Sequence, residues 1–169
     1  MGDFLTIALN AKHKKSDFAC GESYLDEYLQ KYASQDQKRK EAAVFVLTDA
    51  ERVVIGYYTL SAIHIPLEEF SAGQLKKLRL SPYQKKPATL LGRLAVHQGS
   101  KNMRLGELLL IDALKRSYYQ SEQVGSMAVV VDALHEQAAR FYLTYGFVAF
   151  PDNPLRLFLP MKIIGQLFV

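Results

Sequence analysis

The 169-residue sequence contains one cysteine, Cys20, no tryptophan and no long hydrophobic run. A single cysteine cannot form an internal disulfide, and with four scattered histidines it makes no zinc-binding pattern. Every apolar run is shorter than ten residues, whereas a membrane-spanning helix needs about 20. The first residues also lack the pattern of a signal peptide. We therefore expect a cytoplasmic protein that binds no metal and does not span a membrane.

Two common nucleotide-binding motifs are also missing, the Walker lysine loop and the glycine triplet of dinucleotide-binding domains. Nothing therefore supports a nucleoside triphosphatase or an NAD-dependent enzyme. Hydrophobic residues make up 49% of the chain and charged residues 22%, which is typical of a folded globular protein. The length fits one domain, so we expect a single domain over residues 1–169.

Hydrophobic periodicity and turn residues predict that strands and helices alternate along the chain. Tyr24, Tyr28 and Tyr32 recur at helical spacing, on the apolar face of the first predicted helix. The predicted strands are 4–9, 43–47, 53–65, 88–96, 126–132, 147–150 and 155–164; the predicted helices are 22–38, 68–80, 105–117 and 136–145; 81–87 is a predicted loop. This order predicts one mixed α/β sheet with helices on its faces.

The 21 lysine and arginine residues exceed the 17 acidic residues and give a net charge of +4. The basic residues are clustered, which suits an anionic partner because phosphates that pair with cations release counterions. Ordinary solvated loop and helix faces explain the same clusters equally well. If the partner is a nucleic acid, its phosphate contacts are expected among Lys38, Lys76, Lys77, Lys85 and Lys86.

Residues 92–116 carry the most informative pattern, a predicted strand that runs into a loop and then into a long apolar helix. The free N–H groups at a helix N-terminus bind anions, and the helix dipole strengthens that binding. Lys101 and Arg104 add positive charge beside this end. The segment is therefore either a phosphate-binding loop or a surface loop with two solvated cations.

Two motifs in this half of the chain resemble those of the GNAT superfamily of N-acetyltransferases. The family's phosphate-binding signature is Arg/Gln-x-x-Gly-x-Gly/Ala, and residues 101–106 read KNMRLG, with Arg104 in place of the middle glycine. The family's strand followed by an Ala-x-x-x-Tyr-x-x-x-Gly-Phe helix is matched by 129–147, in which His135 replaces a frequent asparagine. The residues on the second motif are Ala138, Tyr142, Gly146 and Phe147. Gly146 is also expected to end this helix in the left-handed conformation.

Within the superfamily, the chain resembles most the bacterial toxins that acetylate aminoacyl-tRNA. The segments that carry this resemblance are DFACGESYLDEYLQKYASQDQKR, VIGYYTLSA, LLGRLAV and LGELLLIDAL. This resemblance implies a mostly antiparallel sheet with helices on both faces and splayed central strands. It also implies acetyl-CoA as co-substrate, the α-amine of charged tRNA as acceptor, and inhibition of translation. A homodimer and a ribbon–helix–helix antitoxin are the implied protein partners.

The resemblance also implies which residues bind acetyl-CoA. The strand end Leu94, Ala95 and Val96 would bind the pantetheine arm, and the loop residues Lys101, Asn102, Met103, Arg104, Leu105 and Gly106 would hold the pyrophosphate. Tyr142 would protonate the thiolate that leaves when the amine attacks the thioester. An α-amine has a pKa of about 7.7–8.0, so part of it is neutral at pH 7 and a strong general base is not required.

Three interpretations stay open from the residues themselves. The leading one is an acetyltransferase that acts on aminoacyl-tRNA; an acetyltransferase for a protein or small-molecule amine and a non-catalytic CoA- or RNA-binding module are the others. Arg93 is either a contact of the acceptor or a surface arginine on a strand. His97 is the one histidine near the predicted site, and we expect it to be a loop residue.

Overall fold

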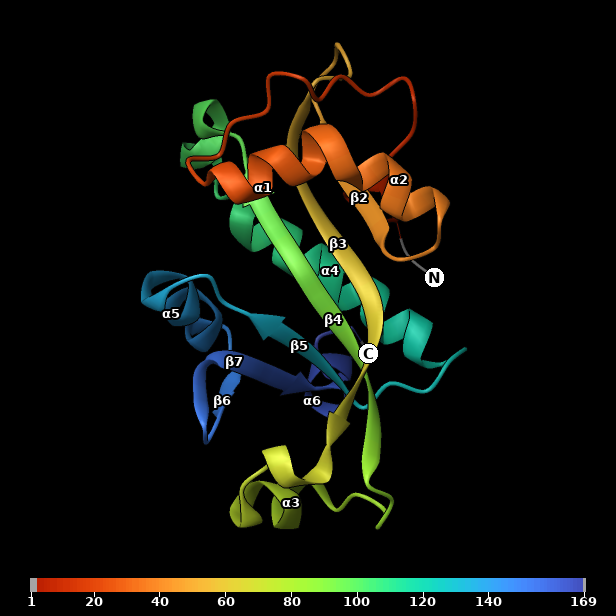
Figure 1. The fold of residues 1–169 in the computed structure, drawn as a ribbon, viewed down its shortest axis with the longest axis vertical. Coiled ribbons are helices and arrows are strands. Elements are labelled where there is room, and N and C mark those ends of the chain that lie inside the picture. The colour runs from red at the N-terminus through yellow and green to blue at the C-terminus, as the bar shows by residue number, and fades with distance from the viewer. Residues whose placement is uncertain (1–2, 169) are drawn as a thin grey trace. The chain divides into compact units, whose positions relative to one another are not determined.

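The structure is a computed structural model that describes residues 3–168 (Figure 1). Its strands are β1 (Ile7–Ala8), β2 (Ala43–Thr48), β3 (Val54–Pro66), β4 (Lys85–Val96), β5 (Ala128–Asp132), β6 (Val148–Phe150) and β7 (Asn153–Pro160). Its α-helices are α1 (Ser23–Glu27), α2 (Ala33–Lys38), α3 (Ala72–Leu78), α4 (Leu105–Ser121), α5 (Glu136–Thr144) and α6 (Met161–Gly165). A π-helical turn, η1 (Tyr28–Tyr32), joins α1 to α2, and short 3-10 helices form at η2 (Leu67–Glu69) and η3 (Gln98–Met103).

Within the described residues, seven strands form one sheet in the order β1-β2-β3-β4-β5-β7-β6. The pairs β1–β2, β2–β3, β5–β7 and β6–β7 are antiparallel. The predicted hairpin of β2 and β3 is confirmed, with Val46 opposite Tyr57. The expectation of a mixed α/β fold with a mostly antiparallel sheet is therefore confirmed.

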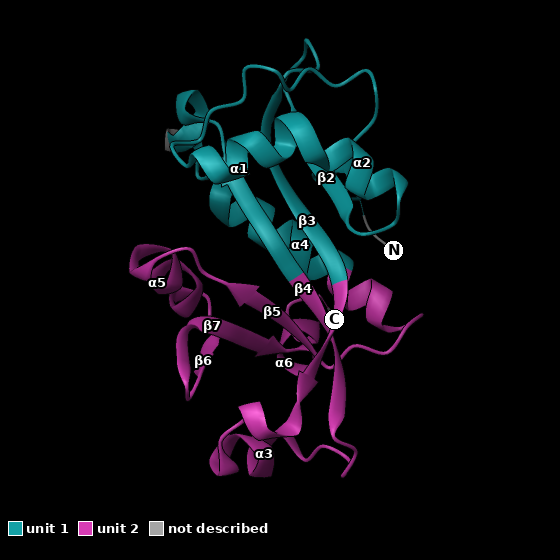
Figure 2. Cartoon of the chain, viewed as in Figure 1, with its two compact units in different colours: residues 1–61, 91–116 teal, residues 62–90, 117–169 magenta. Residues whose placement is uncertain are grey.

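The chain divides into two compact units (Figure 2). Unit 1 comprises residues 1–61 and 91–116, and unit 2 comprises residues 62–90 and 117–169. In unit 1, buried side chains from the first helical segment pack with those of β2 and β3, among them Leu29, Val44 and Tyr57. In unit 2, Phe70, Phe150 and Phe158 form the centre of a second core. That the whole chain acts as one domain stays a prediction.

Several predicted elements have different bounds in the structure; helix α4, for example, runs to Ser121 and not to residue 117. The first strand is reduced to two residues, and the helix predicted over 68–80 becomes η2 followed by α3. Strand β4 begins at Lys85, inside the predicted loop, and includes Pro87, which has no N–H to donate but whose carbonyl accepts the N–H of Met127 at 2.9 Å. The last predicted strand is too long. It ends at Pro160, and a short helix, α6, follows.

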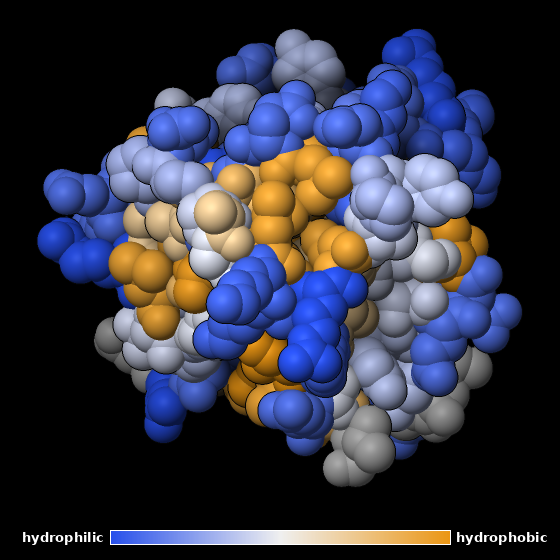
Figure 3. All heavy atoms as spheres, turned by 90° about the horizontal axis from the view of Figure 1, so that it is seen from below, coloured by the Kyte–Doolittle hydropathy of each residue, from blue (hydrophilic) through white to orange (hydrophobic). Residues whose placement is uncertain are grey.

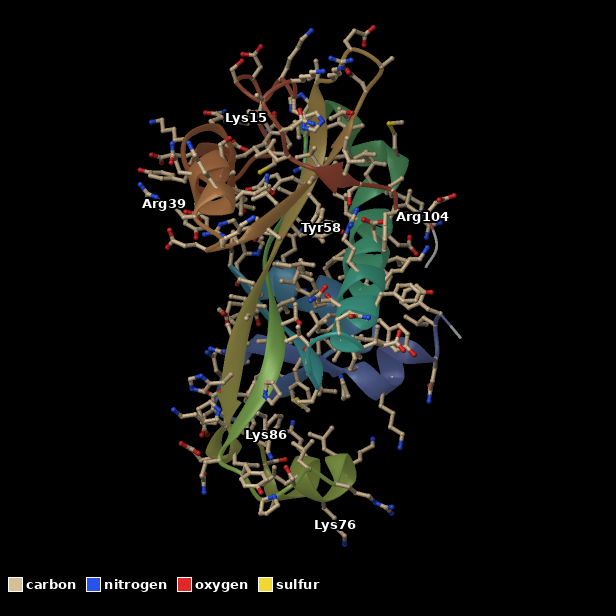
Figure 4. All side chains as sticks on the ribbon, turned by 90° about the vertical axis from the view of Figure 1, so that its right-hand side faces the viewer. Lys15, Arg39, Tyr58, Lys76, Lys86 and Arg104 are labelled. Atoms are coloured by element: carbon tan, nitrogen blue, oxygen red, sulfur yellow. The ribbon has the colours of Figure 1, made fainter. Side chains whose placement is uncertain are left out.

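A buried polar network fixes α4 to the N-terminal segment within unit 1. The carboxylate of Asp112 accepts hydrogen bonds from the hydroxyls of Thr6 (2.5 Å) and Tyr58 (2.8 Å) and from the N–H of Leu5 (2.6 Å). Tyr58 points from β3 toward α4, as Figure 4 shows. Arg116 lies one turn further along α4, and its Nε is 3.7 Å from Asp112 Oδ2. The helix that follows the candidate phosphate loop is therefore held in place by hydrogen bonds as well as by apolar packing.

Candidate active site

The loop that precedes α4 begins where β4 ends. The N–H of His97 donates to the carbonyl of Ile55 at 2.8 Å, and the chain then forms the 3-10 helix η3. Arg104 follows with φ 55° and ψ 30°, and its carbonyl accepts the N–H of Leu108 at 3.3 Å. Arg104 therefore ends η3 and starts α4 in the left-handed conformation.

This backbone geometry explains the glycine of the motif. A positive φ is a conformation that glycine adopts without steric cost and that a side chain with a Cβ disfavours. Arg104 stands at the position of the middle glycine and keeps the glycine-like conformation. The arginine at this position therefore adopts a backbone conformation that a glycine would adopt more readily.

The side chain of Arg104 is directed toward the first turn of α4. Its Nη2 lies 2.5 Å from Oε2 of Glu107, three residues along the chain, and the arginine side chain is 79% exposed (Figure 4). Glu107 also places a negative charge at the positive end of the helix dipole. Glu107 is not among the residues predicted for the site, although an arginine and a glutamate three residues apart at a helix are a known pairing signal.

The remaining loop residues differ in exposure. Lys101 and Met103 are exposed, Leu105 is buried and Gly106 is half-buried in the first turn of α4. The side chain of Asn102 lies outside the described part of the structure. The first N–H groups of this 17-residue helix have no partner inside the helix, so they are free to bind an anion. Together with Lys101 and the exposed guanidinium of Arg104, they could bind a phosphate or pyrophosphate group.

Leu94, Ala95 and Val96 form the end of β4. Ala95 is buried, and its carbonyl oxygen lies 3.4 Å from the position that a Cβ on Gly56 would occupy. Cδ1 of Leu109 lies 2.8 Å from that same position, so the glycine lets α4 approach β3 closely. Binding of pantetheine by the backbone of these three residues stays a prediction.

His97 holds the segment before α1 and is not free to act as a base. Its Nδ1 accepts the N–H of Ala19 at 3.1 Å, and its ring lies 5.8 Å from that of Phe18. Cys20 is buried next to this segment, and burial raises the pKa of its thiol to about 11. Both residues therefore have structural contacts that account for their positions.

Arg93 lies against an aromatic ring in unit 1. Its Cζ is 3.4 Å from the ring centroid of Tyr28 and 6.0 Å from that of Tyr24. Neither of the two sequence interpretations included these tyrosines. Tyr24 and Tyr32, which were expected on the apolar face of the helix, are in fact 56% and 54% exposed, whereas Tyr28 is buried.

In unit 2, Tyr142 is positioned by the end of α5. Gly146 has φ 93°, as predicted, and its N–H donates to the carbonyl of Leu143 at 3.1 Å. The N–H of Phe147 donates to the carbonyl of Tyr142 at 3.3 Å, and these two bonds together form a Schellman motif. The ring of Phe147 lies 5.4 Å from that of Tyr142. The Tyr-x-x-x-Gly-Phe spacing therefore has a structural reason: the glycine ends the helix, and the phenylalanine after it packs against the tyrosine.

The hydroxyl of Tyr142 has the protonation state that a general acid needs. Its side chain is buried, and burial raises its pKa above the ordinary value of a tyrosine. The group therefore holds its proton at neutral and mildly alkaline pH. At the other end of α5, Nδ1 of His135 accepts the N–H of Ala138 at 3.1 Å, so this histidine caps the helix as an asparagine would.

The predicted phosphate-binding lysines are not equivalent. Lys38, Lys76, Lys77 and Lys85 are exposed. Lys86 differs from the expectation because it is only 4% exposed, and its Nζ donates to the carbonyl oxygen of Ser81 (2.6 Å) and to its hydroxyl (2.9 Å). The side chain of Lys86 therefore stabilises the loop from Ser81 to Lys86. Lys76 projects from α3 (Figure 4). Seen from below, the surface has hydrophilic and hydrophobic side chains lying side by side (Figure 3).

Two further findings concern the described residues alone. No helix among residues 3–168 combines the length and the apolar character that crossing a membrane requires. In the same part of the chain, no group of three or more histidine, cysteine, aspartate or glutamate side chains is arranged to hold a metal ion.

Comparisons with known proteins relate this arrangement to solved structures. No family model matches the sequence. The tRNA-acetylating toxin of Mycobacterium tuberculosis is 34% identical over 147 residues, which cover 87% of this chain and 86% of that toxin. The structure of AtaT complexed with acetyl-methionyl-tRNAfMet matches with a TM-score of 0.87 and 30% identity, covering 99% of this chain and 100% of AtaT. A tyrosine-to-phenylalanine variant of AtaT, bound to the C-terminus of the antitoxin AtaR and acetyl-CoA, matches with a TM-score of 0.82 and 27% identity over 99% of each chain.

The sheet order and these structural matches define a GNAT-fold protein. The chain belongs to the family of tRNA-acetylating toxins.

Proposed function

We propose that the protein transfers the acetyl group of acetyl-CoA to the α-amine of the amino acid on charged tRNA. The observation that carries this proposal is the match to AtaT in complex with acetyl-methionyl-tRNAfMet, which spans 99% of this chain at 30% identity. The 34% identity to a tRNA-acetylating toxin supports the same reaction.

In this proposal, the first turn of α4 holds the pyrophosphate of acetyl-CoA. Its free N–H groups and Lys101 supply positive charge, and Arg104 can exchange its contact with Glu107 for one with a phosphate oxygen. The left-handed backbone at Arg104 supports this role because it is a conformation that the glycine of the motif would also adopt readily. The backbone of Leu94, Ala95 and Val96 is assigned to the pantetheine arm.

Tyr142 is the proposed general acid. Acetyl-CoA supplies the thioester: the neutral amine forms a C–N bond with the acetyl carbon, the C–S bond breaks, and the amine loses a proton to solvent. The leaving sulfur takes the proton of the Tyr142 hydroxyl. The raised pKa of Tyr142 supports this role, because the hydroxyl is protonated at the pH at which the amine is already partly neutral.

The exposed lysines are the proposed contacts for the tRNA backbone. Lys38 in unit 1 and Lys76, Lys77 and Lys85 in unit 2 have the exposure that phosphate contacts require. Lys86 is left out of this surface because its ammonium group is buried and bonded to Ser81.

The cellular role follows from the same proposal. Acetylation of charged tRNA would stop translation, so the protein would act as a cytoplasmic toxin, as one domain and as a homodimer. A ribbon–helix–helix antitoxin would neutralise it. The AtaT variant bound to the C-terminus of AtaR supports an antitoxin, and sedimentation of the purified protein tests the dimer.

The experiment that tests the reaction is incubation of the pure protein with labelled acetyl-CoA and total charged tRNA. We expect label in the RNA fraction, and we expect none when the tRNA is first deacylated. Label that enters peptides or small amines instead would favour the second interpretation. Acetyl-CoA binding without any transfer would favour a binding module, and either result would contradict the proposal.

A further inference from the structure

Three planar side chains form a stack in unit 1. The rings of Tyr57 and Tyr28 are nearly parallel, with centroids 6.4 Å apart and planes at 12°, and the guanidinium of Arg93 covers Tyr28 at 3.4 Å. The Tyr57 hydroxyl donates to the carbonyl of Leu25 at 2.7 Å, and the Tyr28 hydroxyl donates to the carboxylate of Asp36 at 2.8 Å. These bonds fix both rings, so the orientation of the arginine is fixed as well.

Tyr24 lies at the outer end of this arrangement. It is 56% exposed, and its ring centroid is 6.0 Å from Cζ of Arg93, at the limit of a cation–π contact. The helix widens here, because the N–H of Ala33 donates to the carbonyl of Tyr28, an i to i+5 bond of a π turn. Such turns occur frequently at functional sites.

Arg93 does not have the contacts of a structural arginine. Its Nε is buried with no hydrogen-bond partner among the described residues, and its Nη1 reaches the hydroxyl of Thr59 only at 3.5 Å. A buried donor without an acceptor is costly. The Nε atoms of Arg116 and Arg156 are in the same state, but both of these arginines lie beside carboxylates, whereas Arg93 lies stacked against Tyr28. A guanidinium held flat against a tyrosine is suited to stacking with another planar group.

The surrounding charges indicate what kind of planar group would bind. The helix that carries Tyr24 also carries Asp26, whose carboxylate accepts the N–H of Cys20, and Glu27, which pairs with Lys31. The charge of Glu27 is compensated by Lys31, whereas Asp26 bonds to a neutral backbone N–H and keeps its negative charge, which disfavours a phosphate but does not affect a neutral aromatic ring. A nucleobase is such a ring, and single-stranded nucleic acids are bound by stacking their bases on aromatic and arginine side chains.

We propose that Tyr24 and Arg93 form a binding site for a nucleobase of the single-stranded 3′ end of the acceptor tRNA. This inference rests on the proposed function, because it assigns a place on the protein to the end of the substrate that carries the amino acid. Tyr24 stacks on the base, and Arg93, held by Tyr28, supplies the planar guanidinium of the site.

The test compares three substitutions on one helical segment. Tyr24→Ala should raise the KM for charged tRNA about tenfold or more, since base–aromatic stacking is removed, whereas Tyr24→Phe should stay within about twofold of the parent. Tyr32→Ala is the matched control, because Tyr32 is 54% exposed on the same helical segment and is not part of the proposed site. It should behave like the parent, and acetyl-CoA affinity and thermal midpoint should be unchanged in all three variants.

The salt dependence of the KM distinguishes the stacking contact of Tyr24 from the phosphate contacts of the lysines. The KM ratio of Tyr24→Ala to parent should be the same at about 50 and about 200 mM salt, because a neutral side chain releases no counterions. The ratio should also be the same for every aminoacyl-tRNA. A ratio that depends on the amino acid would place the aminoacyl side chain at Tyr24 instead of a base and would overturn the inference.

The design keeps the two proposals apart. If the parent does not acetylate charged tRNA, the proposed function fails. If the parent acetylates charged tRNA and Tyr24→Ala matches Tyr32→Ala, the reaction stands and only the nucleobase site is rejected. Arg93→Lys keeps the charge but not the planar group, so it should raise the KM as Tyr24→Ala does.

Discussion

At the scale of single residues, Tyr142 is held by contacts that do not need its hydroxyl. Its ring packs edge-on against Phe141 and Phe147, with centroids 5.2 and 5.4 Å away, and its carbonyl is bonded at the helix end. The phenyl ring of a phenylalanine would make the same contacts. The two roles of this tyrosine, packing and proton donation, can therefore be separated by one substitution.

Tyr142→Phe should keep the fold and the affinity for acetyl-CoA and should lower kcat by about 100-fold or more, the usual contribution of a positioned acid. The measurement is the rate of acetyl transfer to charged tRNA, with thermal unfolding as the check on the fold. Tyr145→Phe is the control, because Tyr145 also packs on Phe141 but is given no proton to donate. Equal rates for the Tyr142→Phe variant and the parent would make Tyr142 a packing residue only.

The pH profile follows from the raised pKa of Tyr142. The α-amine must be neutral to attack, so kcat/KM for charged tRNA should rise through its pKa of about 7.7–8.0. An acid with a lowered pKa would lose its proton within this range and produce a falling limb. Because burial raises the pKa of Tyr142, the profile should level off once the amine is neutral and should show no decline between about pH 8 and about pH 9.5. A decline within this range, with the protein folded and the ester bond intact, would contradict the assignment.

At Arg104, the backbone conformation favours glycine, whereas the proposed phosphate contact favours a cationic side chain, so two substitutions can separate these effects. Arg104→Gly relieves a positive φ of 55° and removes one cation, so acetyl-CoA binding should change only mildly. Arg104→Glu keeps the strain and puts a carboxylate beside Glu107, so the Kd for acetyl-CoA should rise about tenfold or more. Calorimetric titration with acetyl-CoA measures both. An unchanged Kd for the glutamate variant would remove Arg104 from the site.

At the scale of secondary-structure elements, the attachment of α4 can be tested apart from catalysis. Removal of one partner from a buried ion pair commonly costs about 3–5 kcal/mol, whereas exposed pairs contribute about 1 kcal/mol or less. Asp112→Ala should therefore lower the free energy of unfolding by several kcal/mol, because it leaves Arg116 without its counter-ion and the hydroxyl of Tyr58 without its acceptor.

Glu27→Ala is the comparison for that experiment. It breaks the exposed pair of Glu27 with Lys31, whose side chains are 53% and 64% exposed, and should change the free energy of unfolding by less than about 1 kcal/mol. Denaturant unfolding of both variants gives the two values. Similar decreases in the two variants would mean that the Asp112 network does not stabilise α4.

The elements that local chemistry specifies were predicted well. The end of α5 depends on one glycine, and Gly146 adopts the left-handed conformation that its position predicts. Helix α6 was missed because Ile163 and Ile164 favour a strand, while the helix begins after Pro160 and the N–H of Met161 bonds to the distant carbonyl of Met127. A contact between residues so far apart in sequence leaves no local signal.

The same distinction applies to the candidate site. The loop from Lys101 to Gly106 is a local motif, and it could be found from its residue types and its place before a helix. The burial of Lys86 depends on how the chain folds back to Ser81, and the stack of Arg93 on Tyr28 joins β4 to η1. The sequence predicted that Lys86 would contact phosphates and that Tyr24 would lie on the apolar face of a helix. Only the tertiary structure shows that Lys86 is buried and that Tyr24 is exposed.

At the scale of the whole molecule, the net charge of +4 is small, so the position of the cations decides whether tRNA is bound. Nonspecific attraction would depend on total charge alone. A binding surface would depend on particular lysines. Variants with equal net charge but different lysines removed distinguish these possibilities.

The first variant changes Lys76, Lys77 and Lys85 to glutamine, and the control changes Lys12, Lys14 and Lys162, which are also exposed. Each lowers the net charge by three. If the first three lysines bind phosphates, that variant alone should raise the KM for charged tRNA, and the slope of log affinity against log salt should fall by about one for each phosphate that is no longer neutralised. Acetyl-CoA affinity should not change in either variant. Equal effects in both variants would mean that only the total charge matters, and no effect in either would favour a small amine as the acceptor, since it makes too few charged interactions to respond to salt.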